Sequence, residues 1–537
     1  MILRTFSGIN KIKKSKSLVI SIGAVILLTL ISKVSGLFRE QVMASYYGAG
    51  MEMDAYNIAY YLPNLFRMLI ADAALISAFI PIMSSYIAQG DLGNANRVVN
   101  TVVNYILVFL TVLILIAFPF VPGLISILPQ MKSNPELMKL SVDLTRIMLP
   151  TLVLMSLSGI LSSIMNSFDN FASVSVSPVI FNSAIISAVI LLHSRYGVHA
   201  LAYGVLAGTL LQLIFLLLFS RRLPLRYKPE LHFRHPGVRS MFALMLPATI
   251  SLGCIQINES VDKIFALSIG TGFVSVLNYA IRIWYLPLGI FAVAVSTVLF
   301  PAISRMASTG DVSGMKSAFS TGMREIFFLM LPATAGIMVL SAPITRLIYE
   351  RGEFTASNTH MVALTLFYFS IGLIPYSVLT LLNRVFYAMK DTRTPLIVAA
   401  ISIFFNFVFD LILIRFLSYA GLALSTSLVG TANFLALAFL LRRKIGRLGA
   451  REIFNSVIRM ALATALMSAI AYFIWYLLDR LLGRGTLSQI LSLGSSIVIA
   501  IGAYIILCYA FKLNELKQLA LYLKSKVSGV VIGSGES

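Results

Sequence analysis

The sequence has few charged residues and almost no cysteine. Only 12% of its 537 residues are Asp, Glu, Lys or Arg, and 58% are hydrophobic, whereas soluble domains usually carry about 25% charged residues. A chain this apolar is typical of a protein that crosses a membrane several times. The two cysteines, Cys254 and Cys508, lie in apolar runs, so a disulfide framework and a cysteine-based metal site are both disfavoured.

Acidic residues are also scarce, and several functional motifs are missing. Lys and Arg number 42 against 21 Asp and Glu, which gives a net charge of +21. A nucleic-acid-binding protein would collect such charge on a soluble domain, and no polar stretch is long enough to form one. No GxxxxGK loop followed by Ser or Thr is present, which disfavours a directly ATP-driven pump. An intramembrane enzyme acting on polyprenyl phosphates would need an acid, base or nucleophile cluster, and none is found. We therefore expect a transporter and not an enzyme.

Long apolar runs predict an all-α membrane protein with fourteen transmembrane helices. Each run is long enough to cross a bilayer of about 30 Å, and polar, glycine or proline breaks separate the runs. The predicted spans are 18–47, 54–87, 97–128, 136–165, 172–193, 198–220, 240–268, 274–306, 315–348, 357–389, 394–416, 420–442, 453–480 and 487–511.

Lys and Arg gather in alternate connections between these spans. They are most frequent before the first span, after the sixth and twelfth spans, and in the C-terminal tail. With fourteen spans all these segments lie on one side, which the positive-inside rule assigns to the cytoplasm. We therefore expect both termini in the cytoplasm and a basic leader before a retained first helix. Contact with anionic lipid head groups is the alternative explanation of the basic clusters. His232 and His235, after the sixth span, have no partner carboxylate in a metal-binding pattern and are interpreted as solvated loop residues.

Short words recur in the sequence at a nearly constant offset. YYLP at 60–63 returns as WYLP at 284–287, FIP at 79–81 as LFP at 299–301, and QGDLG at 89–93 as TGDVSG at 309–314. Offsets of 220–224 residues predict two parallel six-helix repeats related by a pseudo-two-fold axis along the membrane normal, with the substrate site between them. The predicted domains are an N-terminal lobe at 1–222, a C-terminal lobe at 223–447, two additional helices at 448–511 and a tail at 512–537.

Basic residues also occur inside the predicted spans. Lys33, Arg39 and Arg67 lie in the first two spans, and Arg282 lies in the eighth. Because a charge that faces lipid costs about 2.5–3.5 kcal/mol, such residues normally face a wet or protein-lined interior. Arginine binds phosphate through paired hydrogen bonds, so a diphosphate is a suitable ligand.

The geometry of this cationic set leaves two readings open. The two basic residues of the first span are six positions apart and would point about 120° away from each other on a regular helix. A bend at Ser35–Gly36 would turn both toward one cavity. The alternative is that the basic residues snorkel or pair internally, for example Arg39 with Glu40 or Arg67 with Asp72.

A second polar set combines carboxylates with amide and hydroxyl oxygens. Asp262 lies in the seventh span, Asn406 and Asp410 in the eleventh, and Thr426 in the twelfth. Asn406 and Asp410 are four positions apart and share a helix face. Such oxygens suit sodium or a proton in a transporter, and hydrogen bonding between helices is the alternative.

Five longer motifs cover much of the chain: SKVSGLFRE at 32–40, GAGMEMDAYNIAYYLPNLFR at 48–67, AFIP at 78–81, YERGEF at 349–354 and NRVFYAMKDTRTP at 383–395. They resemble the MurJ family of lipid II flippases, in the multidrug/oligosaccharidyl-lipid/polysaccharide exporter superfamily. The resemblance extends over nearly the whole chain, including the two additional C-terminal helices, which in relatives form a groove for the lipid tail.

This resemblance implies roles for individual residues. It places the essential cavity arginines of the family at Arg39, Arg67 and Arg282, and it puts Lys33 where the family commonly has arginine. That lysine keeps the charge but loses the planar fork. Ile281 and Tyr285 stand where the family usually has acidic residues beside the arginine of the eighth span. Asp54 and Ser275 match positions that matter in the family, and a sodium site of some members maps onto Asp262, Asn406, Asp410, Thr426 and the carbonyl of Leu422.

The resemblance also implies the activity. We expect alternating-access transfer of undecaprenyl-diphosphate-linked peptidoglycan precursor, lipid II, from the cytoplasmic to the outer leaflet of the bacterial inner membrane. Membrane potential or a cation gradient would drive it, because outward movement of each negative charge is favoured by about 2.3 kcal/mol per 100 mV. The expected partners are lipid II, membrane lipids and, transiently, the cell-wall synthesis machinery. We expect a monomer that binds no nucleic acid and has no cofactor apart from sodium.

Two transport alternatives stay open within the same superfamily. One is an exporter of another polyprenyl-linked oligosaccharide, and the other is a multidrug exporter. A multidrug exporter of cations would line its cavity with acidic residues, whereas this sequence places Lys and Arg in the spans.

Overall fold

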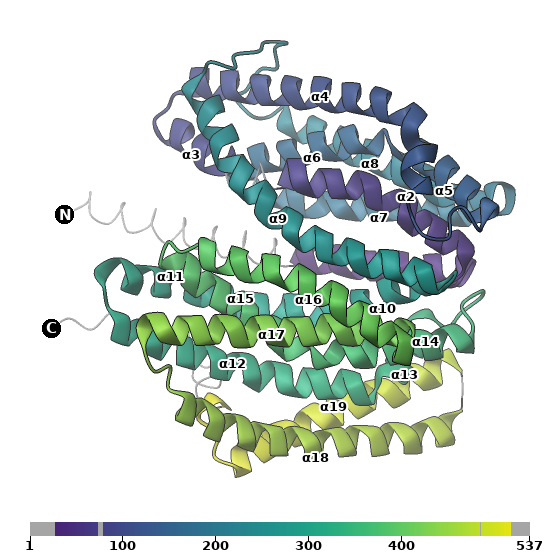
Figure 1. Cartoon of the computed structure of the whole chain (residues 1–537), viewed down its shortest axis with the longest axis vertical. Helices are drawn as coiled ribbons and strands as arrows, with labels where there is room; N and C mark the ends of the chain where they lie inside the picture. The colour runs from purple at the N-terminus through teal and green to yellow at the C-terminus, as the bar shows by residue number, and fades with distance from the viewer. Residues whose placement is uncertain (1–26, 73–78, 484, 517–537) are drawn as a thin grey trace, which may run out of the picture. The chain divides into compact units, whose positions relative to one another are not determined.

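The computed structural model describes residues 27–72, 79–483 and 485–516. These residues fold into helices joined by turns, and they contain no strand (Figure 1). The all-helical fold expected from the sequence is confirmed. The basic leader and most of the C-terminal tail lie outside the described residues.

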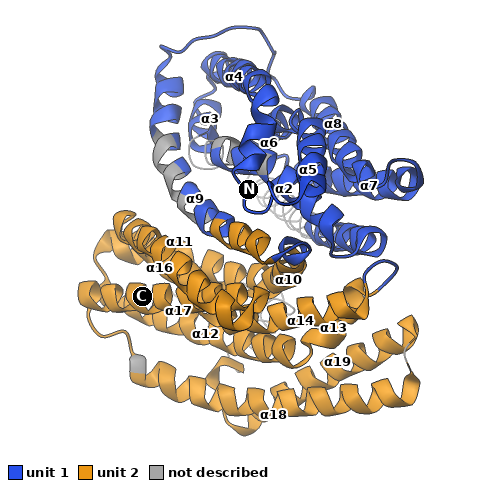
Figure 2. Cartoon of the chain, turned by 45° about the vertical axis from the view of Figure 1, so that its right-hand side comes forward, with its two compact units in different colours: residues 1–260, 270–275, 351–354 blue, residues 261–269, 276–350, 355–537 orange. Residues whose placement is uncertain are grey.

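The chain divides into two compact units (Figure 2). Unit 1 contains residues 1–260, 270–275 and 351–354, and unit 2 contains residues 261–269, 276–350 and 355–537. The helix α9 begins in unit 1 and ends in unit 2. The lobe boundaries expected at 222 and 447 stay a prediction.

Unit 1 is built from the first helices of the chain. Its helical segments are 27–47, α2 (Met51–Phe66), the π-helical turn η1 (Arg67–Asp72), α3 (Ile80–Ala88), α4 (Leu92–Ser126), α5 (Pro135–Met148), α6 (Thr151–Ser167), α7 (Phe171–Tyr196), α8 (His199–Ser220) and most of α9 (Pro236–Ile269).

Unit 2 contains most of the remaining helices. They are α10 (Phe273–Pro287, whose residues 273–275 belong to unit 1), the π-helical turn η3 (Leu288–Ala292), α11 (Val293–Thr309), α12 (Val312–Val339), α13 (Ser341–Tyr349), α14 (Ala356–Ile371), α15 (Leu373–Ala388), α16 (Arg393–Leu417), α17 (Tyr419–Ile445), α18 (Ala450–Leu482) and α19 (Thr486–Ala510).

Nine helices in the described part of the chain are long and apolar enough to cross a membrane. The number rises to eleven if the bent pairs α5–α6 (42°) and α14–α15 (44°) each form one span. These eleven correspond to eleven of the predicted spans. Of the other three, 18–47 and 54–87 include residues outside the described part, and 240–268 falls in α9, several of whose side chains also lie outside it. The chain is therefore a multi-pass membrane protein, and the number fourteen stays a prediction.

Local structure recurs at the same offset as the sequence words. A π-helical turn follows α2 and another follows α10. Asp91 caps α4 by accepting from the backbone N–H three residues on at 3.0 Å, and Asp311 caps α12 in the same way at 2.8 Å. A side-chain oxygen at this position satisfies an N–H that the first helical turn leaves unpaired. The two halves of the sequence therefore encode the same succession of caps, π-helical turns and bent helices.

In unit 1, α7 and α8 approach closely because α8 carries glycines at the contact. A Cβ on Gly204 would lie 2.9 Å from the Cβ of Ala188, and one on Gly208 would lie 2.9 Å from the carbonyl oxygen of Phe181. Two glycines four positions apart let helix backbones pack against each other in a membrane. This contact fixes α7, which supplies a side chain to the site described below.

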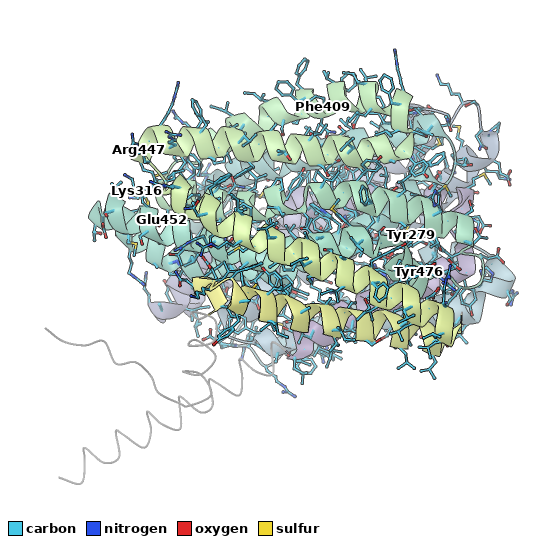
Figure 3. All side chains as sticks on the ribbon, turned by 90° about the horizontal axis from the view of Figure 1, so that it is seen from below. Tyr279, Lys316, Phe409, Arg447, Glu452 and Tyr476 are labelled. Atoms are coloured by element: carbon cyan, nitrogen blue, oxygen red, sulfur yellow. The ribbon has the colours of Figure 1, made fainter. Side chains whose placement is uncertain are left out.

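In unit 2, α18 and α19 pack on α12 through an apolar core that includes Phe328, Met460, Met467 and Tyr504. The charged side chains of Lys316, Arg447 and Glu452 lie at one end of these helices, and the aromatic side chain of Tyr476 lies toward the other (Figure 3). Polar ends around an apolar middle are expected of helices that cross a membrane.

Candidate functional site

Arg39 lies in the helix at 27–47 and contacts α7. Its Nη1 donates to Asn182 Oδ1 at 3.1 Å, its Nη2 forms an ion pair with Glu40, and its guanidinium carbon lies 5.8 Å from the centre of the Phe181 ring. Glu40 and Asn182 are both buried. The internal pairing of Arg39 with Glu40, considered from the sequence, is confirmed. Asn182 is a partner that sequence reasoning missed.

The side-chain amide of Asn182 connects Arg39 to the preceding helical turn, which contains Ser32 and Ser35. Its Nδ2 donates to Ser35 Oγ at 2.9 Å, and that hydroxyl donates to the carbonyl of Ser32 at 2.8 Å. A Cβ on Gly36 would lie 3.6 Å from the same Nδ2. Residues 27–47 form one uninterrupted helix. The Asn182 amide of α7 therefore packs against Ser35 and Gly36 without interrupting this helix.

The other three basic residues lie on three different helical segments. Arg67 opens the π-helical turn, and its Nε and Nη2 both donate to Asn64 Oδ1, at 3.2 and 3.1 Å. Its expected pairing with Asp72 involves a side chain outside the described ones. Lys33 is exposed on the helix at 27–47 of unit 1, and Arg282 is exposed on α10 of unit 2. The gathering of all four into one cavity stays a prediction.

Asp54 in α2 is one of the residues predicted to contact substrate. Its carboxylate caps the first turn of α10. Its Oδ1 accepts from the backbone N–H of Ser275 at 2.8 Å and from the Ser275 hydroxyl, and its Oδ2 accepts from the N–H of Gly272. Asn57 also donates to the Ser275 hydroxyl at 3.2 Å. Asp54 is fully buried. An N-terminal helix turn leaves such N–H groups unpaired, so α2 supplies the cap that Gly272 has no side chain to provide.

Gly272 is required by this arrangement. Its φ is +93°, and a Cβ at this position would lie 2.6 Å from the carbonyl oxygen of Ala49. A residue with a side chain would therefore be strained and would clash with the backbone. The structure thus brings Asp54 and Ser275 together as a helix cap, and their contact with substrate stays a prediction.

The carboxylate set predicted from the sequence forms one cluster in unit 2. Asn406 Nδ2 donates to Asp262 Oδ1 at 2.9 Å and to Asp410 Oδ2 at 3.0 Å. Thr426 Oγ1 lies 3.0 Å from Asp262 Oδ2 and 3.1 Å from the carbonyl oxygen of Leu422. All five predicted residues therefore meet. Ser425, whose hydroxyl lies 3.4 Å from Asn406 Nδ2, is a further member that the sequence reasoning missed.

One oxygen of this cluster has no partner. Asp410 is fully buried, and its Oδ1 accepts no hydrogen bond within the part of the chain that the structure describes. A buried charged oxygen without a partner is costly. Two carboxylates, a hydroxyl and a main-chain carbonyl are oxygen ligands of the kind that hard cations prefer, and Asn406 orients the two carboxylates through its Nδ2. The donor set therefore fits a sodium ion.

The comparisons with known proteins agree with these motifs. The family model described as lipid II flippase MurJ matches residues 43–516. The chain belongs to the lipid II flippase MurJ family. A protein of Rickettsia prowazekii named probable lipid II flippase MurJ is 33% identical over 493 residues, which are 90% of this chain and 96% of that protein. A Rhizobium meliloti protein of the same name is 34% identical over 460 residues, covering 83% and 84% of the two chains.

Solved structures agree with the MurJ assignment. A structure described as lipid II flippase MurJ in an inward closed conformation has a TM-score of 0.74 and 27% identity, and the match covers 91% of this chain and 98% of that one. An inward-facing multidrug resistance MATE transporter of the MOP superfamily has a TM-score of 0.64 at 15% identity, covering 80% and 98%. The second likeness shows the fold alone.

Proposed function

We propose that this MurJ-family chain transfers lipid II from the cytoplasmic to the outer leaflet of the bacterial inner membrane by alternating access. The observation that carries the proposal is the family match over residues 43–516, supported by relatives at 33% and 34% identity that are named as lipid II flippases. The proposal makes the chain a carrier of a lipid-linked precursor and not an enzyme.

The setting of Arg39 supports a phosphate-binding role. Asn182 and Glu40 contact Nη1 and Nη2, whereas the buried Nε has no hydrogen-bond partner among the described residues. Guanidinium N–H groups bind phosphate oxygens in pairs. In the proposed cycle Arg39, Arg67, Arg282 and Lys33 bind the diphosphate of lipid II, and Asn182 keeps Arg39 in position when the phosphate replaces Glu40.

The proposed architecture is the one that the internal repeat predicts. It has fourteen spans with both termini in the cytoplasm, and two six-helix lobes related by an axis along the membrane normal. The recurrence of caps, π-helical turns and bent pairs in the two halves supports it. The proposed protein acts as a monomer and contacts the cell-wall synthesis machinery transiently.

An apolar cavity in unit 2 supports a site for the lipid tail. It has a volume of about 540 Å³ and is lined by residues of α12, α18 and α19, among them Phe328, Gly336, Met467, Ile501 and Tyr504. A polyprenyl chain is wholly apolar, so its transfer into such a cavity from a membrane costs little. This proposal gives the two helices outside the repeat a function.

The carboxylate cluster is the proposed sodium site. Asp262, Asp410, the Asn406 amide, the Thr426 hydroxyl and the Leu422 carbonyl would hold the ion. A bound sodium ion would offset one of the two carboxylate charges and supply a gradient-coupled step. The unpartnered Asp410 Oδ1 is the feature of the chain that supports this assignment.

Depletion in cells tests the proposal. In bacteria depleted of their own flippase, expression of this chain should restore growth and prevent lipid II from accumulating on the cytoplasmic leaflet. Accumulation that continues despite normal expression in the membrane would contradict it. Export of cationic dyes without any effect on lipid II would favour the multidrug alternative, which the MATE fold likeness alone does not establish.

A further inference from the structure

The connection between α8 and α9, residues 221–235, crosses the first turns of α4 in unit 1 (Figure 1) and is called the strap below. Side chains of α4 bind its backbone. The hydrogen bonds run from Arg226 N to Asn96 Oδ1 (2.8 Å), from Asn100 Nδ2 to the Arg226 carbonyl (3.3 Å), from Asn104 Nδ2 to the carbonyls of Lys228 and Glu230 (3.0 Å each), and from His232 N to Thr101 Oγ1 (3.1 Å).

The spacing of the α4 asparagines explains why they act together. Asn96, Asn100 and Asn104 are four positions apart and therefore share one helix face. Asn100 and Asn104 are buried beneath the strap. Buried amides usually have hydrogen-bond partners. Here the strap carbonyls accept from the Nδ2 of Asn100 and of Asn104, whereas the Oδ1 of Asn100 has no partner among the described residues. The strap is thus a fixed part of unit 1 and not a freely moving loop.

His235 ends the strap in a second hydrogen-bonded network. Its Nδ1 accepts from the backbone N–H two residues on at 3.2 Å, and its Nε2 lies 3.1 Å from Asn94 Oδ1. The Asn94 Nδ2 donates to Asp91 at 2.7 Å. An Nδ1 that accepts requires the neutral ring with its proton on Nε2. Burial, followed by the charges of Arg97 and His232, lowers the pKa of His235. His235 is therefore structural, in contrast to the solvated role expected from the sequence.

The strap and α4 form a pocket of about 630 Å³. Arg97 and Arg234 both line it, and neither forms an ion pair with a carboxylate of the described residues. Glu230 pairs instead with Lys228 at 3.7 Å and with His232 at 3.3 Å. Two guanidinium groups thus line one pocket without a direct ion pair to a described carboxylate, and Asp91 is the acidic residue that interacts with Arg97 electrostatically.

The same pocket has apolar walls that face outward. Leu231 and Phe233 line it, and they are 50% and 48% exposed. The adjoining helix α4 is one of the helices apolar enough to cross a membrane. Exposed aromatic and aliphatic side chains beside the end of such a helix are suited to the boundary between head groups and acyl chains. A free phosphate in solution would make no use of them.

We propose that this pocket binds the phosphate of an anionic phospholipid head group. Arg97 and Arg234 bind the phosphate oxygens, and Phe233 and Leu231 contact the lipid below it. Because the asparagine face of α4 fixes the strap, the cations are in place before the lipid arrives. The pocket shares no residue with the surroundings of Arg39 or with the carboxylate cluster.

Lipid selectivity around the pocket tests this proposal. Full-length protein carrying Phe233→Trp is reconstituted in phosphatidylcholine vesicles that contain either brominated phosphatidylglycerol or brominated phosphatidylcholine at the same mole fraction. The difference from protein without the new tryptophan removes the signal of Trp284 and Trp475. The proposal predicts stronger quenching by the anionic lipid. Equal quenching by both lipids would overturn it.

Matched variants separate the pocket from general surface charge. Arg97→Gln with Arg234→Gln should reduce the preference by about fivefold for each arginine. Arg221→Gln with Arg222→Gln removes the same charge from the strap outside the pocket and should keep the preference. An equal loss in both pairs would reduce the pocket to ordinary surface charge and overturn the site. If the double pocket variant does not reconstitute, Arg234→Gln alone replaces it.

Two further experiments identify the ligand that the pocket binds. Arg97→Lys with Arg234→Lys keeps the charge and should retain most of the preference, whereas complete loss would contradict an electrostatic site. Excess sodium phosphate at constant ionic strength should not abolish the preference; if it does, the pocket takes free phosphate and the lipid assignment is wrong. The assay measures no transport, so its outcome is independent of the proposed flippase activity.

Discussion

Two pairs of helices are each joined by an asparagine and a charged residue, and the charge has the opposite sign in the two pairs. One pair is the helix at 27–47 with α7 in unit 1, and the other is the end of α9 with α16 in unit 2. Arg39 donates to the amide oxygen of Asn182 at 3.1 Å, and Asp262 accepts from the amide nitrogen of Asn406 at 2.9 Å. Asp262 follows Arg39 by 223 residues and Asn406 follows Asn182 by 224, both within the offset of the internal repeat. The two pairs therefore occupy corresponding places in the two halves.

The difference shows how one scaffold serves two signs of charge. An asparagine amide carries an acceptor and a donor, so it can orient a guanidinium or a carboxylate. Beside the first asparagine the Nε of Arg39 is a buried donor without a partner among the described residues, and beside the second the Oδ1 of Asp410 is a buried acceptor without one. The first pair suits an anionic ligand and the second suits a cation.

Removing the cation should have the largest effect. Arg39→Ala is expected to abolish rescue of flippase-depleted cells, because an arginine–phosphate contact of about 3 kcal/mol corresponds to roughly a hundredfold in affinity. Arg39→Lys, which keeps the charge, should rescue partially. Growth and lipid II accumulation at matched membrane expression are the measurements. Full rescue by Arg39→Ala would remove the phosphate-binding role.

Removing a carboxylate should break the other side of the comparison. In wild-type protein, sodium at ten times its dissociation constant should stabilise the fold by about 1.4 kcal/mol relative to choline. Asp410→Asn keeps the side-chain shape but removes the charge, so this gain should disappear. Thermal unfolding in the two salts measures it. If sodium stabilises wild type and variant equally, the cluster is a hydrogen-bonded helix contact without an ion site.

Part of this comparison was available from the sequence. The recurring words predicted the repeat, and the spacing of Asn406 and Asp410 predicted a shared helix face, because both depend on local periodicity. The Arg39–Asn182 contact joins residues 143 positions apart, and no local pattern reports such a distance. Asp262 and Thr426 were grouped with Asn406 and Asp410 only because all four are polar residues within apolar spans and because the motifs resemble the MurJ family.

Other features were missed although a signal was present. Asn96, Asn100 and Asn104 follow each other at helical spacing around the start of the predicted span 97–128, which indicates a polar face with a partner. The partner, the strap backbone, has no sequence signature because main-chain groups are common to all residues. Asp54 was expected to meet substrate, and its role as a cap for α10 depends on a tertiary contact with Gly272 and Ser275.

Asp54 is a buried carboxylate that accepts hydrogen bonds from backbone N–H groups, whereas Asp262 accepts from the side chains of Asn406 and Thr426. Asp54→Ala should destabilise the protein by about 1–2 kcal/mol, as expected for loss of a helix cap, and should leave the sodium response intact. Asp54→Asn retains one acceptor and should lose less. Thermal unfolding in sodium and in choline measures both effects. Unchanged stability with lost transport would instead place Asp54 in contact with substrate.

In unit 2, Asp391 forms an ion pair with Lys444 that is more exposed than the pair of Arg39 with Glu40. Removing it is expected to have the smallest effect on stability. Burial alone would raise the pKa of Asp391, but hydrogen bonds from Lys444 and Thr394 outweigh it and lower the pKa to about 2. A lowered pKa stabilises the fold above the ordinary value of about 4, and this contribution is lost as pH falls toward 2.

Because the Lys444 side chain is 45% exposed, solvent screening limits the contribution of this pair to about 1 kcal/mol or less. Asp391→Asn should therefore be slightly less stable than wild type at pH 6, and the difference should shrink as the pH is lowered from 4 toward 2. Unfolding midpoints across this range are the measurement. A difference that grows at acidic pH would contradict the assignment.

The most direct test of the account is the movement of lipid II between leaflets of vesicles reconstituted with purified protein under an imposed potential. Wild-type protein should transfer lipid II faster than protein-free vesicles, and faster still when the potential is negative on the donor side. Arg39→Ala should not exceed the protein-free rate. Equal rates in all three preparations, or transfer by Arg39→Ala at the wild-type rate, would contradict the claim that Arg39 and the other basic residues of the predicted spans bind the diphosphate during export.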